Sequence, residues 1–180
     1  MNTAYAADIA NNSDGYHGLE ALQCMVERRN GGESGISSVQ TLVGEAIWEA
    51  ASAGRWSLQL AQAALAVVDV SAENEAAADA VAAATGANAA AAMSTAVGSD
   101  AALFLIEYTD GFRAALLHGQ GEGNLINGWA YSAQVAGEVL ATCFNGSQAP
   151  NYAGFSYLCP SIAVVPLSGD LAKSGARTTG

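Results

Sequence analysis

The pattern of hydrophobic and polar positions is clearest between Leu103 and Gly119, where two apolar runs flank the residues TDG at positions 109–111. An Asp-Gly pair between apolar runs favours a tight hairpin, because glycine adopts positive φ without a Cβ clash. We therefore predict neighbouring antiparallel strands over Leu103–Tyr108 and Phe112–Leu117. The first of them is apolar at nearly every position, which predicts a strand inside a sheet and not at its edge.

Helical spacing of apolar residues predicts helices ahead of this hairpin. The first helix follows Asp14, has two arginines near its C-terminal end, where they suit the helix dipole, and stops at a pair of glycines. A second helix is predicted over Gly44–Ala53 and a third over Leu58–Val68, for which Ser57 is a suitable N-cap. The intervening stretch, Ser34–Val43, is predicted to be loop and strand.

Two further strands are predicted over Trp129–Val135 and Glu138–Phe144, on either side of Gly137. Because helices come first and strands later, we predict one α+β domain over residues 1–180, with a mostly antiparallel, open sheet of about four to six strands and helices packed on one face. The alanine-rich residues 71–100 are expected to form a loosely packed insertion with a spacer role. Residues 168–180 lack apolar periodicity and are expected to be a mobile tail.

The net charge of the chain limits the kinds of molecule that are expected to bind it. The 180 residues include 17 acidic and 6 basic side chains, a net charge of −11, which repels phosphate backbones and anionic lipids. Neither nucleic acid nor a membrane is therefore expected as a partner. The absence of a signal-peptide pattern and of a long apolar stretch predicts a cytoplasmic location. Three widely spaced cysteines without a CxxC pair predict reduced thiols, not a zinc knuckle or a disulfide framework.

The candidate chemistry centres on His17, which has Asp14 three residues before it and Glu20 three residues after it. A carboxylate beside an imidazole fixes its tautomer and raises its pKa, as general acid–base catalysis near neutral pH requires. These three residues are the catalytic candidates, although a histidine in the first turn of a helix is also a common capping or packing residue. A metal site formed with Cys24 or His118 has less support, since the chain has no HExxH motif, and no GxSxG motif indicates a serine hydrolase.

Several motifs resemble a known family. The run DGYHGLEALQCMVERRNGGESGISSVQTLVGEAIWEA at residues 14–50, the later runs LFLIEYTDGFRAALLHGQG and WAYSAQVAGEVLATCF, and the terminal RTTG resemble the C-terminal half of glucose-fructose oxidoreductase/inositol dehydrogenase-like (Gfo/Idh/MocA) proteins. In that family a Rossmann domain precedes an α+β domain, whose open sheet packs on the cofactor domain and commonly mediates oligomerisation. The resemblance places the family's catalytic histidine at His17.

The chain also departs from that family. It has no GxGxxG motif and no lysine before Lys173, and Ser13 stands where the family has an acidic residue, with Asp14 one residue later. The resemblance thus implies a substrate and oligomerisation domain that is not catalytically competent alone, binds no cofactor by itself, and works with NAD(P) only if a Rossmann domain is supplied.

Two other interpretations remain open at this point. One is a non-enzymatic self-associating or binding module, and the other is an unrelated hydrolase or metalloprotein that uses His17 and Glu20. A small-molecule substrate fits the enzymatic alternatives. A strand that is apolar on both faces needs cover twice, so we also expect a homo-oligomer, formed through the sheet face that carries Phe104, Ile106 and Tyr108.

Overall fold

The computed structural model describes residues 13–32, 34–68, 74–120, 129–144 and 161–165. Its elements, in chain order, are α2 (Ser13–Val26), β1 (Ile36–Val43), α3 (Glu45–Ser52), α4 (Leu58–Leu65), α5 (Glu75–Ala83), α6 (Ala87–Val97), β2 (Ala102–Tyr108), β3 (Arg113–His118), β4 (Trp129–Val135), β5 (Glu138–Phe144) and β6 (Ser161–Val165). The predicted tail at residues 168–180 lies outside the described residues.

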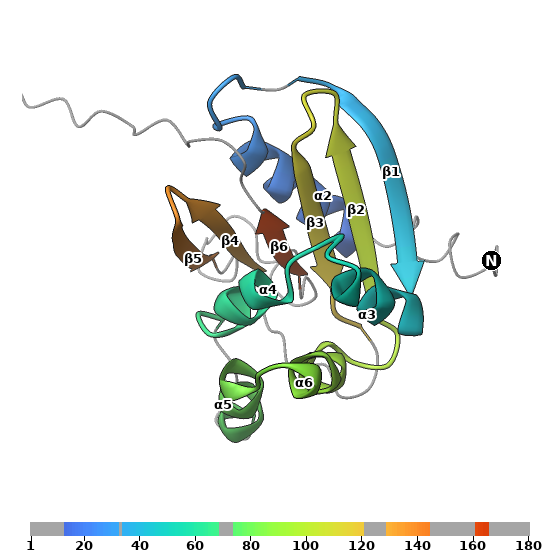
Figure 1. The fold of residues 1–180 in the computed structure, drawn as a ribbon, viewed down its shortest axis with the longest axis vertical. Coiled ribbons are helices and arrows are strands. Elements are labelled where there is room, and N and C mark those ends of the chain that lie inside the picture. The colour runs from blue at the N-terminus through green and yellow to red at the C-terminus, as the bar shows by residue number, and fades with distance from the viewer. Residues whose placement is uncertain (1–12, 33, 69–73, 121–128, 145–160, 166–180) are drawn as a thin grey trace, which may run out of the picture.

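The strands form one sheet in the order β1-β2-β3-β6-β4-β5 (Figure 1). Neighbouring strands are antiparallel except for β4 and β6, which run parallel. The predicted α+β class and the mostly antiparallel sheet are therefore confirmed. The internal position predicted for the first strand of the hairpin is also confirmed, because β2 lies between β1 and β3. Strand β6, which no sequence pattern predicted, joins the β2–β3 hairpin to the β4–β5 hairpin.

The hairpin between β2 and β3 forms as the Asp-Gly signal predicts. Gly111 has a φ of 81°, and its backbone N–H donates to the carbonyl of Tyr108 over 3.0 Å. The Asp110 side chain accepts a hydrogen bond of 3.0 Å from the backbone N–H of Phe112. This side-chain contact closes the turn from within, since aspartate readily bonds the backbone two residues on.

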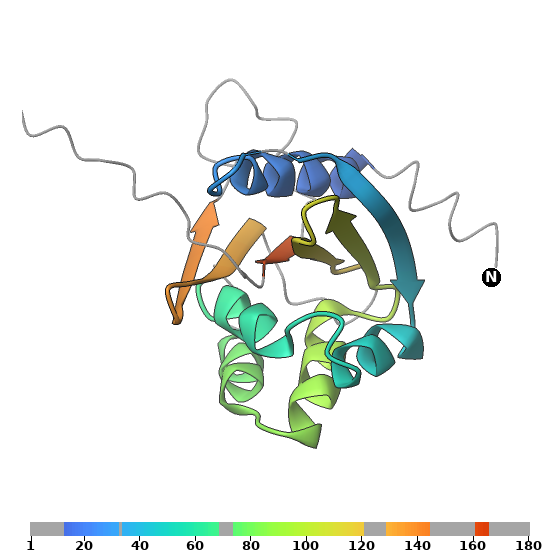
Figure 2. The ribbon, with the colours of Figure 1, turned by 45° about the horizontal axis from the view of Figure 1, so that its top comes forward.

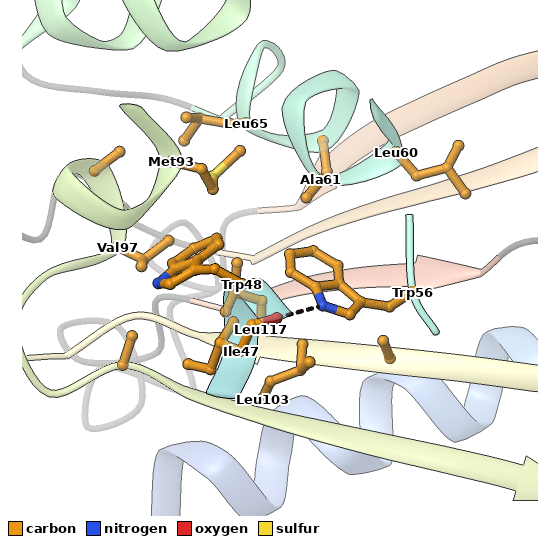
Figure 3. Packing of buried hydrophobic residues seen from close by; sticks show 14 of the residues in the cluster. Ile47, Trp48, Trp56, Leu60, Ala61, Leu65, Met93, Val97, Leu103 and Leu117 are labelled. Carbon is orange, nitrogen blue, oxygen red and sulfur yellow. Dashed lines mark hydrogen bonds between the residues drawn. The ribbon is translucent and has the colours of Figure 1, made fainter. Parts of the chain in front are cut away.

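One face of the sheet packs against α3, α4 and α6 (Figures 2 and 3). Leu103 and Leu117 from the central strands lie under Trp48 and Trp56, whose ring centroids are 6.0 Å apart. The Trp56 indole N–H donates to the carbonyl of Ile47 over 2.9 Å, which satisfies the buried polar atom of that ring. The predicted helices on this face are confirmed, including the N-cap, since the Ser57 hydroxyl accepts from the backbone N–H of Leu60.

The alanine-rich segment contributes to this core, which corrects the expectation of a loosely packed insertion. In α6, Met93, Ala96 and Val97 are fully buried and belong to the same cluster as the tryptophans. The helix therefore contributes to the packed core despite its low side-chain volume. In α5 only Val81 is buried, and Gln62 of α4 donates to its carbonyl over 2.8 Å.

The opposite face of the sheet is covered by α2, which crosses above it in Figure 2. Leu22 and Val26 pack against Phe104, Ile106 and Tyr108, and the last three are at most 8% exposed. Helices therefore lie on both faces. The expectation that a second copy covers this part of the face is wrong, because the chain's own first helix already covers it.

Candidate functional site

The predicted catalytic residues all lie on α2. Glu20 is exposed and accepts a hydrogen bond from the Tyr16 hydroxyl, and this bond with its carboxylate charge raises the pKa of Tyr16 above its usual value. His17 and Asp14 belong to the helix, but their side chains lie outside the described part of the structure. Their catalytic role remains a prediction.

Metal ligation has no support in the described residues. Among them, no group of three histidine, cysteine, aspartate or glutamate side chains is placed to hold a metal ion. His118 is almost fully buried in β3, whereas Cys24 is exposed on α2 with a free thiol. The two side chains proposed as additional ligands therefore occupy different environments.

The order of the described helices and strands differs from that of a dinucleotide fold. A dinucleotide fold places the pyrophosphate at the start of a helix that follows a parallel strand. Here all five described helices precede β2, and the parallel strands β4 and β6 are separated in the chain by β5. Among the described residues, no helix therefore follows a parallel strand as it does in a dinucleotide fold.

Arg29 forms a polar junction on the α2 side of the sheet. Its guanidinium donates to Asp110 over 2.7 Å, to the Ser34 hydroxyl over 2.8 Å and to a backbone carbonyl of α2. It also lies 4.9 Å from the ring centroid of Tyr108 and 4.5 Å from that of Phe112, within cation–π range. The hydrogen bond from Arg29 holds the pKa of Asp110 below its usual value. Because its guanidinium donates to these three protein groups, Arg29 has a structural role.

A polar pocket of about 280 Å³ lies on the opposite side of the sheet, over β1, β2 and β3. Its lining includes two arginines, Arg55 from the link between α3 and α4 and Arg113 from the start of β3. Leu105 and Glu107 of β2 line it between the flanking strands. The other lining residues are Ser38, Gln40, Ile106 and Ala114. No sequence motif predicts this pocket, because its residues come from four separate segments.

Two hydrogen bonds order the polar side chains of the pocket. The Arg55 guanidinium donates to the Gln40 side chain. The Ser38 hydroxyl donates to Oε2 of Glu107 over 3.2 Å. Arg113 stands opposite Glu107 in the strand register, and among the described residues it makes no ion pair. The pocket therefore presents two positive groups, one negative group and hydrogen-bonding side chains to solvent.

Comparisons with protein-family models, curated proteins and solved structures find no match to this chain. In the described part of the chain, every helix is too short or too polar to cross a bilayer. The functional conclusion therefore depends on the residues and their geometry.

Proposed function

We propose that this chain is the substrate and oligomerisation domain of an oxidoreductase of the Gfo/Idh/MocA type. A Rossmann domain, on the same polypeptide or on another chain, would bind NAD(P). The α+β domain described here would then close the substrate side of the active site, with α2 contributing its catalytic candidates.

The observation that carries this proposal is the junction between two motif segments that are far apart in the sequence. Residues 14–50 and residues 103–121 resemble the family, and the alanine-rich segment separates them. In the fold, Arg29 of the first segment bonds Asp110 of the second over 2.7 Å, and β1 pairs with β2. The segments that carry the resemblance thus form one structural unit, which supports their origin as one functional domain.

His17 is the proposed acid–base group. Hydride transfer between an alcohol carbon and a nicotinamide requires a group that takes up or returns the hydroxyl proton, and an imidazole suits this role near neutral pH. Glu20, one helical turn away, lies on the exposed side of α2. The test is titration of the chain with NADH and NADPH, and we expect no binding until a Gfo/Idh/MocA-type Rossmann domain from the same genome is added. Tight binding by this chain alone would refute the proposed division of labour.

One observation favours a second candidate, a self-associating module. In the sheet formed by the described strands, β1 lies at one edge and has no charged residue, and its Ile36, Val39 and Val43 are 50%, 57% and 39% exposed. Uncharged edge strands with exposed aliphatic side chains readily pair with another strand. A second copy could join its own β1 to this edge and extend the sheet across a two-fold axis.

A further inference from the structure

We propose that the pocket over β1, β2 and β3 binds a small organic dianion, a dicarboxylate with a hydroxyl group. Arg55 and Arg113 would each bind one carboxylate, and Glu107 would accept a hydrogen bond from the hydroxyl. The site lies on the face of the sheet opposite α2, so it goes beyond the proposed catalytic role of that helix.

The distribution of charge is the first reason. The chain has only 6 basic residues against 17 acidic residues, and two of the six line this one pocket. The negative charge of the whole molecule disfavours anions, whereas the charged side chains that line this pocket are two guanidinium groups and one carboxylate, which favour an anion locally. Arginine is also the side chain best suited to bind a carboxylate in a bidentate manner.

The strand order is the second reason. Arg113 belongs to β3, Arg55 bonds Gln40 of β1, and β2 lies between those strands. Neighbouring strands are about 4.8 Å apart, so Arg113 of β3 and Gln40 of β1, to which Arg55 donates, lie on strands about 10 Å apart. A four-carbon diacid has the length to bring one carboxylate toward each guanidinium, and a monoacid reaches only one of them.

The centre of the pocket fits the middle of such a ligand. Leu105 is buried and offers an apolar surface for the carbon chain. Ser38 donates to Oε2 of Glu107, and Oε1 of that carboxylate would accept a hydrogen bond from a ligand hydroxyl. The negative charge of Glu107 disfavours an anion that lacks such a donor. This feature predicts a preference for malate over succinate.

The volume sets an upper limit on the ligand. At about 280 Å³ the pocket is near the lower end of the range for small-molecule sites, roughly 300–1,000 Å³. It suits a metabolite of a few carbons and is too small for a dinucleotide. Binding here would therefore require neither a nicotinamide nor a Rossmann domain.

Calorimetric titration of the full chain with L-malate at low ionic strength tests the site, with succinate, L-lactate and inorganic phosphate as comparison ligands. We expect malate to bind, and succinate and lactate to bind more weakly. Arg55→Gln and Arg113→Gln should each weaken malate binding by roughly tenfold or more, the loss typical of one charge-assisted contact. Arg28→Gln, which removes an exposed arginine outside the pocket, should leave malate binding unchanged.

Three results would overturn the proposal. The first is an absence of malate binding, and the second is malate binding that neither pocket variant weakens. The third is tighter binding of inorganic phosphate than of malate at the same arginines, which would replace the dicarboxylate with a phosphorylated ligand. Circular dichroism melts of both variants check the fold, which we expect to be intact because both arginines are exposed. Failure here would leave the oxidoreductase proposal standing, since that proposal is tested with nicotinamide.

Discussion

At the residue scale, Arg29 illustrates how one side chain connects distant parts of this fold. It lies just after α2, is 6% exposed, and has both an ion-pair partner and two aromatic neighbours at the turn between β2 and β3. A buried guanidinium is tolerated only when its donors are satisfied, and here a carboxylate, a hydroxyl and a carbonyl satisfy them. This junction fixes the end of α2 over the hairpin.

The Arg29–Asp110 pair should make the free energy of unfolding decrease at low pH. The pKa of Asp110 is lower in the folded chain than its usual 3.8, so the pair's contribution is present above that pH and is lost as the pH falls through the folded value. We expect Asp110→Asn to lower the free energy of unfolding at pH 7. The difference in this free energy between the variant and the wild type should become smaller in acid. Denaturant titrations of both proteins at pH 7 and in acid measure this difference. Asp79→Asn, at an exposed position on α5, controls for the loss of one charge, and a difference independent of pH would disprove the coupling.

Tyr131 should make the free energy of unfolding decrease at high pH. Burial raises the pKa of its hydroxyl from 10.0 to about 12, so the folded chain keeps this proton when the unfolded chain has lost it. Its contribution is complete below pH 10 and is lost between about pH 10 and 12, by up to about 3 kcal/mol. Tyr131→Phe should remove that pH-dependent loss. Unfolding measured from pH 9 to 12 checks it, and an equal alkaline loss in both proteins would be the contrary result.

Local signals predicted some of these residue roles and missed others. The Ser57 cap and the Asp110 turn were predictable, because each depends on a contact within three residues. Arg29 was assigned only to the helix dipole, since its partner is 81 positions away in the chain. The pocket arginines, Arg55 and Arg113, come together only through the strand order, which no local pattern contains.

At the element scale, the hairpins and the short helices follow from the sequence, and the remaining elements depend on long-range packing. Both strands of the β4–β5 hairpin were predicted with their observed bounds from the runs on either side of Gly137, which has positive φ in the turn. Strand β6 was missed because its partners, β3 and β4, precede it by many residues. The packing of α6 was missed because alanine propensity indicates a helix without indicating what it contacts.

The contribution of α6 to the core can be measured at Met93, which is fully buried. Met93→Ala should lower the free energy of unfolding by about 2–5 kcal/mol, because it removes buried apolar volume and leaves a cavity. Thr95→Ala on the same helix changes an exposed residue and should cost less than about 0.5 kcal/mol. Chemical denaturation of the three proteins decides the question. Equal stability of Met93→Ala and wild type would restore the interpretation of the segment as a loosely packed insertion.

Self-association can be tested at the β1 edge. If two copies pair through β1, Val39→Lys should convert a dimer to a monomer, because it places a charge on the exposed apolar row of that strand. The matched control is Val139→Lys on β5, the strand at the other edge of the sheet. Sedimentation velocity at micromolar concentration distinguishes the two variants. A wild-type monomer at all concentrations, or a dimer lost only in Val139→Lys, would eliminate the β1 interface.

At the scale of the whole molecule, helices on both faces enclose one sheet, and two chemically different regions remain at its surfaces. One is α2 with its catalytic candidates, and the other is the arginine-lined pocket on the far side of the sheet. The class of fold was predictable from the order of helices and strands. The cover on both faces was not, because the sequence pattern did not indicate which helix packs on which side.

We propose that this domain supplies the acid–base group to a nicotinamide-binding partner. It is tested by the NAD(P)-dependent oxidation of a panel of polyols and hydroxy acids by the chain mixed with the candidate Rossmann domain. We expect activity only in the mixture, with kcat/KM lowered by roughly a hundredfold or more in His17→Gln and nearly unchanged in Glu27→Gln, an exposed control beyond the end of α2. An inactive mixture, or one in which a folded His17→Gln variant retains full activity, would contradict the claim.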